Sequence, residues 1–83
     1  MNTFIISYDL LNKNIFDYSR LIEYIKSYGT WAKPLESFWI IKTYKSVSEV
    51  RDEISRQVSV NDKILVFDVT NKGWASFNLS KEI

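Results

Sequence analysis

The amino-acid sequence predicts one α+β domain over residues 1–83, with two helices on one face of an antiparallel sheet. Three observations lead to this fold class. Apolar side chains recur at every second position in some stretches and at helical spacing in two others. These stretches follow the order strand, helix, strand, strand, helix, strand, and a short strand closes the chain. The length of 83 residues is enough for a single small core.

The first strand is predicted from Thr3 to Leu10. Phe4, Ile6 and Tyr8 fall on one face of this strand, which we expect to pack under the helices. Asp9 falls on the other, more polar face. We therefore expect its carboxylate to point away from the helices.

A polar loop from Leu11 to Phe16 precedes the first predicted helix. Asp17 is the candidate N-cap, and Gly29 is expected to end the helix because glycine tolerates the left-handed cap conformation. Arg20 falls on the solvated side. The buried stripe consists of Leu21, Ile22, Ile25 and Tyr28.

Two strands are predicted between the helices. The first, Thr30 to Leu35, contains Pro34, which lacks an N–H group and therefore favours the edge of the sheet. The second, Ser37 to Tyr44, is apolar on both faces. That pattern is typical of a central strand.

The second helix is predicted from a capping box, in which Ser46 is followed by Glu49, and it ends near Gln57. A strand from Lys63 to Val69 follows. After an Asn-Lys-Gly turn, Trp74 to Phe77 forms a short last strand. This order is typical of the ferredoxin-like plan, βαββαβ, extended here by a short C-terminal strand.

The composition excludes several kinds of site. The chain has no Cys and no His, which removes thiolate nucleophiles, the commonest general base and the commonest zinc ligand. Only two Gly are present, so there is no glycine-rich phosphate loop. The net charge is +1, without a basic block. The first residues do not resemble a secretion signal and no stretch is long enough to span a membrane, so we expect a cytoplasmic protein without a membrane partner.

The face of the sheet away from the helices is predicted to be apolar. Two helices cover only one side, yet Phe38 and Ile40 alternate with Trp39 and Ile41. We expect a second copy of the chain to cover this face around a two-fold axis. The expected interface residues are Ser37, Trp39, Ile41, Trp74 and Phe77.

The acids in the strands allow two interpretations each. Asp9 either ends a strand in solvent, or it faces its copy across the dimer, where two carboxylates repel and recruit a divalent cation such as Mg²⁺. In the second case Arg20 supplies positive charge for phosphodiester cleavage, although Arg20 also fits a solvated helix face. Asp68 either pairs with Lys42 or Lys72 or assists Asp9.

The tryptophans also allow two interpretations. Trp31, Trp39 and Trp74 either stack on nucleic-acid bases or pack in the core or an interface. The aromatic pattern of RNA-recognition domains is missing from Ser37 to Tyr44, which favours core or interface.

The sequence resembles the CRISPR-associated "Cas two" proteins, together with the VapD-type toxins and SinR-like small proteins of the same fold. The resemblance covers most of the chain. It rests on the segments YDL, YGTWAKPLESFWIIKT and ND-x-x-LVFDVT, which are most similar to the SinR-like branch. It implies a ferredoxin-like homodimer whose sheets face each other and whose last short strand crosses to the neighbour.

The resemblance also implies roles for single residues. In the CRISPR branch, the acid at the end of the first strand is assigned to metal binding in a disputed nuclease activity, and Asp9 is the matching position. Ser37 and Trp39 match a Ser and an aromatic residue of that family. Several arginines often follow the first strand there, whereas this chain offers Lys13 and Arg20 as its nucleic-acid-binding candidates.

Two functions therefore stay open at the level of the sequence. One is a homodimer that binds nucleic acid and acts as a Mg²⁺-dependent endonuclease through Asp9. The alternative is a non-catalytic interaction or regulatory module that binds another protein, such as an inhibitor, an antitoxin-like protein or a phage or host defence factor. The near-neutral charge and the single candidate metal ligand favour the alternative.

Overall fold

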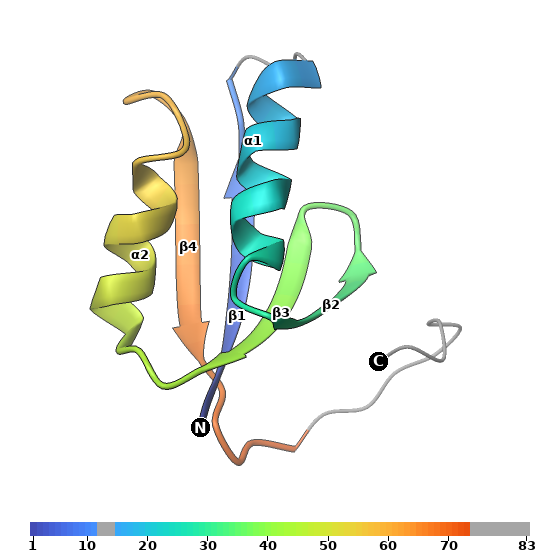
Figure 1. Ribbon diagram of the computed structural model, residues 1–83, viewed down its shortest axis with the longest axis vertical. Helices are drawn as coiled ribbons and strands as arrows, with labels where there is room; N and C mark the ends of the chain where they lie inside the picture. The colour runs from blue at the N-terminus through green and yellow to red at the C-terminus, as the bar shows by residue number, and fades with distance from the viewer. Residues whose placement is uncertain (12–14, 74–83) are drawn as a thin grey trace.

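The computed structural model describes residues 1–11 and 15–73 of the chain. The elements run in the order β1 (Asn2–Asp9), α1 (Ile15–Lys26), β2 (Thr30–Leu35), β3 (Phe38–Thr43), α2 (Val47–Ser55) and β4 (Lys63–Asp68). Both helices lie on the same face of the sheet (Figure 1). The α+β class is confirmed, and the arrangement is compatible with a small ferredoxin-like fold. The expected last strand around Trp74 and Phe77 lies outside the described residues.

The sheet is antiparallel throughout, with the strand order β2-β3-β1-β4. β2 is at an edge and β3 is internal, as the sequence predicts. The pairing of β2 with β3 shifts register between Ala32 and Leu35, the stretch that contains Pro34. A proline at an edge removes no ladder hydrogen bond, and the irregular pairing discourages addition of a further strand there.

α1 begins at Ile15, two residues before the expected N-cap at Asp17. Acidic residues are favoured both at the N-cap and in the first helical turn, so an aspartate alone does not fix where a helix begins. The end of α1 follows the prediction more closely. The helix stops at Lys26, and Gly29 adopts the left-handed conformation with a φ of 92°.

The capping box of α2 is confirmed. The Glu49 backbone N–H donates to the Ser46 hydroxyl at 3.1 Å, and the Ser46 backbone N–H donates to the Glu49 carboxylate at 3.0 Å. Two otherwise unpaired donors at the helix start are thereby satisfied. The helix ends at Ser55, two residues before the predicted end near Gln57.

The core lies between the sheet and the two helices. Its largest member, Trp39, is 1% exposed, and its indole N–H donates to the Tyr8 hydroxyl at 3.1 Å. Buried polar groups need such partners, so the Tyr8 side chain completes the environment of Trp39. The buried apolar residues are Phe4, Ile6, Tyr8, Leu10, Leu21, Ile25, Trp39, Ile41, Val50 and Ile54.

The structure corrects the expected orientation of β3. Trp39 is paired with Ile6 and Ile41 with Phe4, so all four side chains share the helix-covered face. Trp39 and Ile41 are 1% and 0% exposed and therefore have no surface to offer a second copy of the chain.

None of the described helices is long and apolar enough to cross a membrane.

Candidate functional site

The open face, meaning the face of the sheet away from the helices, carries two cross-strand rows that are apolar except for Ser7. The strand register aligns Ala32, Ile40, Ile5 and Phe67 in one row, and Leu35, Phe38, Ser7 and Leu65 in the next. Phe67 is 47% exposed and Leu65 is 54% exposed. The β3 residues on the open face are thus Phe38 and Ile40, whereas Trp39 and Ile41 were the ones expected there as interface residues.

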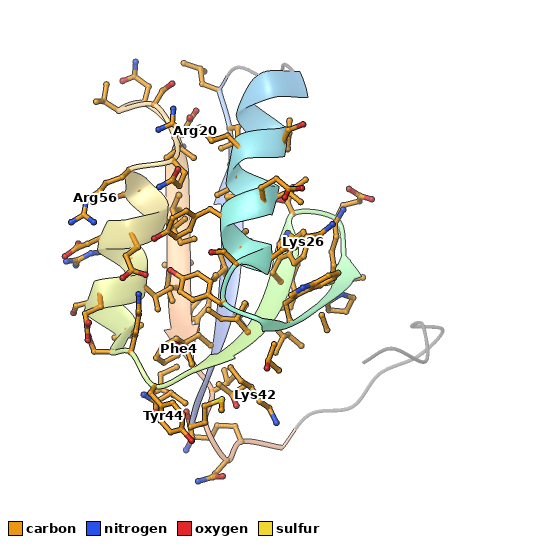
Figure 2. The ribbon with its side chains drawn as sticks, viewed as in Figure 1. Phe4, Arg20, Lys26, Lys42, Tyr44 and Arg56 are labelled. Atoms are coloured by element: carbon orange, nitrogen blue, oxygen red, sulfur yellow. The ribbon has the colours of Figure 1, made fainter. Side chains whose placement is uncertain are left out.

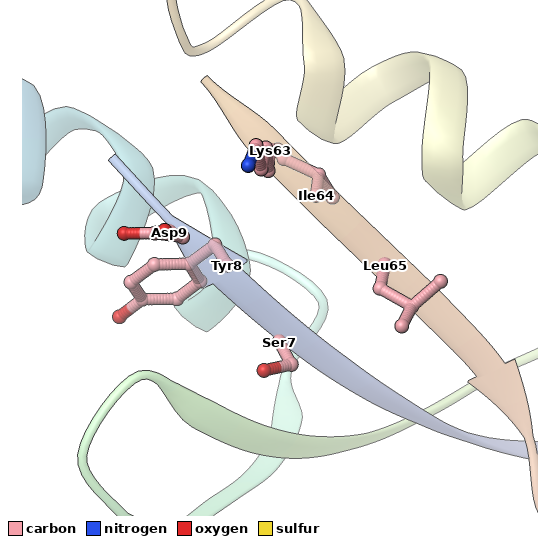
Figure 3. A pocket seen from close by; sticks show the side chains of 6 residues that line it. All are labelled: Ser7, Tyr8, Asp9, Lys63, Ile64 and Leu65. Carbon is pink, nitrogen blue, oxygen red and sulfur yellow. The ribbon is translucent and has the colours of Figure 1, made fainter. Parts of the chain in front are cut away.

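Asp9 lies at the end of β1 on this open face. The alternation of the strand requires it, because Tyr8 is directed into the core and hydrogen-bonded there. Asp9 is exposed and stands opposite Lys63 at the start of β4 (Figure 3). Both residues line a shallow depression of 320 Å³ together with Ser7, Tyr8, Ile64 and Leu65. The carboxylate is therefore accessible to a ligand that approaches the open face.

A second shallow depression adjoins Asp9 at the sheet end. Its volume is 260 Å³, and Asp9, Leu10, Leu11, Asn61 and Lys63 line it. The chain around it is fixed by Asp62, whose carboxylate accepts hydrogen bonds from the backbone N–H groups of Leu11 and Ser59, both at 2.7 Å. Asp62 thereby joins the segment after β1 to the turn before β4.

One protomer offers a metal ion few ligands at this position. Among residues 1–11 and 15–73, no group of three Asp, Glu, His or Cys side chains is placed to hold a metal ion. Asp9 contributes one carboxylate, and Asn61 contributes a neutral amide beside it. Mg²⁺ is typically held by one or two carboxylates with water or substrate phosphate completing its shell, so Asp9 would hold the ion together with a substrate phosphate or with a carboxylate from a second chain.

Arg20 has a structural partner. Its Nε donates to the Gln57 side-chain oxygen and its Nη2 to the Arg56 backbone oxygen, both at 3.2 Å. The guanidinium thus satisfies a carbonyl at the C-terminal end of α2, where a cation also interacts favourably with the helix dipole. Figure 2 places Arg20 between the two helices. The sequence indicated a solvated or phosphate-binding residue, and neither interpretation anticipated this contact.

Asp68 does not assist Asp9. The register pairs Phe4 with Asp68 and Asp9 with Lys63, so the two acids lie about 17 Å apart along the strands and on opposite faces. The Asp68 carboxylate accepts from the Thr70 hydroxyl at 2.6 Å and from the Thr70 N–H at 3.0 Å. These bonds, helped by the charge of Lys72, hold the pKa of Asp68 below its ordinary value.

The remaining predicted site residues are Ser37, Lys13, Trp74 and Phe77. Ser37 lies in the turn between β2 and β3 with a φ of 54°, a backbone conformation unusual for a residue other than Gly, Asn or Asp. The nucleic-acid candidate Lys13 and the interface candidates Trp74 and Phe77 fall outside the described residues.

A polar network between the helices was not predicted. The Tyr28 hydroxyl donates to Glu53 at 2.7 Å, and the Lys45 ammonium donates to the other oxygen of the same carboxylate at 2.6 Å. Burial and the bond to Glu53 raise the pKa of Tyr28. Burial alone would raise the pKa of Glu53, but the bonds from Lys45 and Tyr28 outweigh it and lower that pKa. No periodicity brings three residues this far apart in the chain together.

A second cluster missed from the sequence lies at the β2 edge. Trp31 is 43% exposed and leans on Trp39, with ring centroids 5.3 Å apart. The Lys26 ammonium lies 5.1 Å from the Trp31 ring, and the Lys33 ammonium lies 5.7 Å from the Trp39 ring. Each exposed cation–π contact contributes roughly 0.5 to 1 kcal/mol. We call these four residues the indole–lysine cluster.

Comparison of the chain with models of known protein families finds no match, and no curated protein matches it either.

Proposed function

We propose that the chain forms a ferredoxin-like homodimer that binds nucleic acid, and that Mg²⁺-assisted phosphodiester cleavage at Asp9 is its catalytic activity. One observation carries this proposal. The exposed Asp9 carboxylate stands at the end of β1 on the same open face as the two apolar rows. A partner that covers the apolar rows therefore also approaches Asp9.

The element order supports the ferredoxin-like assignment. Each helix connects two strands that are not neighbours in the sheet, because β3 lies between β1 and β2 and β1 lies between β3 and β4. This split arrangement, with both helices on one face, is the plan that the resemblance to the "Cas two" superfamily implies.

The open face supports a partner that is itself apolar. Large exposed apolar patches on small domains mark interaction sites, and a two-fold axis lets one patch serve both subunits. Ile5 lies in the middle of the face and Phe67 beside it on the edge strand β4, whereas Lys42 and the Asp9–Lys63 pair lie toward the ends of the strands. An apolar centre with a charged periphery is the usual anatomy of a protein interface.

The second copy would also supply what one protomer lacks at the metal site. Two Asp9 carboxylates that meet across the axis would give Mg²⁺ two hard oxygen ligands, and their mutual repulsion would favour a bound cation. When bound, Mg²⁺ activates water and stabilises charge on a phosphate. The chain's own contributions are the Asp9 ligand and the Lys63 ammonium opposite it, which can attract the phosphate group.

The decisive experiment compares wild type with Asp9→Asn in a cleavage assay on single-stranded RNA and duplex DNA, with Mg²⁺ and with EDTA. Asp68→Asn is the matched control, because it removes an exposed strand acid at the far end of β4, on the other face of the sheet. We expect Asp9→Asn to lose at least about 100-fold in rate while Asp68→Asn retains it. Equal cleavage by wild type and Asp9→Asn would remove Asp9 from the mechanism.

A non-catalytic interaction module is the second candidate. Two observations favour it: Arg20 is engaged by the end of α2, and Lys63 stands opposite the only acid on the open face among the described residues. In this case the open face binds another protein. Affinity purification from host extract, with and without nuclease treatment, separates the candidates. A stoichiometric protein partner that survives nuclease supports the module.

A further inference from the structure

The indole–lysine cluster is built from three elements on the helix side of the sheet. Lys26 comes from the last turn of α1, Trp31 and Lys33 from β2, and Trp39 from β3. Trp39 is fully packed in the core, so it gives Trp31 a rigid support. Lys26 is labelled in Figure 2, where it lies beside β2.

Trp31 is distinguished by the charged side chains around it and not by its 43% exposure. Single exposed apolar side chains are common and need no explanation. Here, however, the Lys26 ammonium lies over the half-exposed Trp31 ring, and the Lys33 ammonium lies near the buried Trp39 ring on which Trp31 leans. Within residues 1–11 and 15–73, Lys26 forms no ion pair, and Lys33 meets only Glu36 at 3.6 Å, whose side chain is 95% exposed. Such an exposed pair holds its lysine weakly.

A π face bordered by mobile positive charges matches the chemistry of single-stranded nucleic acid. An unpaired base stacks on an aromatic ring whatever its sequence, and lysines bind the adjacent phosphates. A duplex keeps its bases paired and stacked inside, so it offers the phosphates but not the free base. A base can reach Trp31 if the Lys26 ammonium moves from the ring to a phosphate.

We propose that the indole–lysine cluster binds single-stranded nucleic acid, with one base stacked on Trp31 and neighbouring phosphates bound by Lys26 and Lys33. This deepens the proposed function and rests on its nucleic-acid-binding part, not on cleavage. Trp31 lies two strands and about five residues away from Asp9, roughly 20 Å, and on the opposite face. In a dimer joined through the open faces, both copies of the cluster stay accessible.

The test measures fluorescence anisotropy of labelled oligonucleotides of about 12 residues, within the site size of single-strand binders. The three probes are oligouridine RNA, oligothymidine DNA and a DNA duplex of the same length. We expect wild type to bind a single strand more tightly than the duplex. The RNA and DNA arms then identify which strand is preferred.

Trp31→Ala is expected to weaken single-strand binding about 10-fold, or about 1.4 kcal/mol, whereas Trp31→Phe retains most of it. Tyr44→Ala is the matched control, because Tyr44 is an aromatic side chain that is 82% exposed and lies between Lys42 and Lys45 in the chain. It should bind as wild type does. The double variant Lys26→Gln/Lys33→Gln should reduce the slope of log affinity against log salt by about 1.4. Thermal unfolding by circular dichroism checks that each variant folds.

The outcomes separate this inference from the proposed function. Equal binding by folded Trp31→Ala and wild type, or equal binding of duplex and single strand, overturns the cluster as the site while nucleic-acid binding stands. Absence of binding to all three probes overturns both. Retained binding in Asp9→Asn with lost binding in Trp31→Ala supports the cluster even if no cleavage is found. A protein partner that requires Trp31 and survives nuclease would contradict the inference.

Discussion

The two faces of the sheet use the same strands for different purposes. On the helix-covered face, Phe4, Ile6 and Ile41 are 0 to 1% exposed and form the core. On the open face, their chain neighbours make apolar rows that still meet solvent, with Phe67 at 47% exposure. One face therefore specifies the fold, and the other is free to specify a partner. Substitutions on adjacent residues of one strand can separate these two roles.

The largest expected effect comes from Trp39→Ala compared with Phe38→Ala. Trp39→Ala leaves a cavity and removes the donor to Tyr8, so we expect it to lower the free energy of unfolding by about 3 to 5 kcal/mol. Phe38, one residue earlier, lies on the open face and should cost less than half as much in the monomer. Urea denaturation at low protein concentration measures both. Equal losses would mean that the two faces are equally important to the fold.

The next effect concerns association. Phe67→Glu places a charge in the apolar row that also contains Ile5 and Ile40, so it should weaken a dimer by about 3 kcal/mol, roughly 100-fold in Kd, without unfolding the chain. Sedimentation velocity should give twice the 9.8 kDa chain mass for wild type and the single mass for the variant. Val60→Glu is the control, because Val60 is 98% exposed and lies outside the sheet. A monomeric wild type would show that the open face does not self-associate.

The smallest effect tests the helix layer alone. Glu53→Gln weakens the bonds from Tyr28 and Lys45 and should cost about 1 kcal/mol at pH 7. Because the folded state lowers the pKa of Glu53, its contribution is present above the ordinary value of 4.5 and is lost as the pH falls below it.

The titration of Lys45 determines the alkaline limit of the pH range in which the Lys45–Glu53 ion pair is stabilising. The folded state raises its pKa, so its contribution is present below the ordinary value of 10.5 and is lost as the pH rises through the folded value. Thermal unfolding of wild type and Glu53→Gln between pH 3 and about pH 11 should therefore show their largest separation at intermediate pH. A constant separation down to pH 3 would contradict the role of the Glu53 charge.

Local sequence signals predicted the parts of the fold that depend on neighbouring residues. The alternation of Phe4, Ile6 and Tyr8 identified the buried face of β1 and placed Asp9 on the other face. The capping box at Ser46 and the glycine at position 29 identified helix ends. In each case one residue type satisfies a backbone requirement within a few positions.

The sequence did not determine which face of β3 is buried. Four consecutive apolar residues satisfy either orientation, and only the pairing of Trp39 with Ile6 decides it. The contacts of Arg20 with α2 and of Lys26 with Trp31 likewise depend on how separate elements pack. Asp9 could be placed on its face, but no local pattern reveals which groups approach it from a second chain.

The close approach of Trp31 and Trp39 has a spectroscopic consequence. Two indoles lie with centroids 5.3 Å apart and planes inclined by 58°. We expect their electronic transitions to couple and to give a paired positive and negative band in circular dichroism. Such a couplet disappears when the rings separate or when another aromatic surface intervenes. The protein thus carries an intrinsic optical reporter at its β2 edge, without any attached dye.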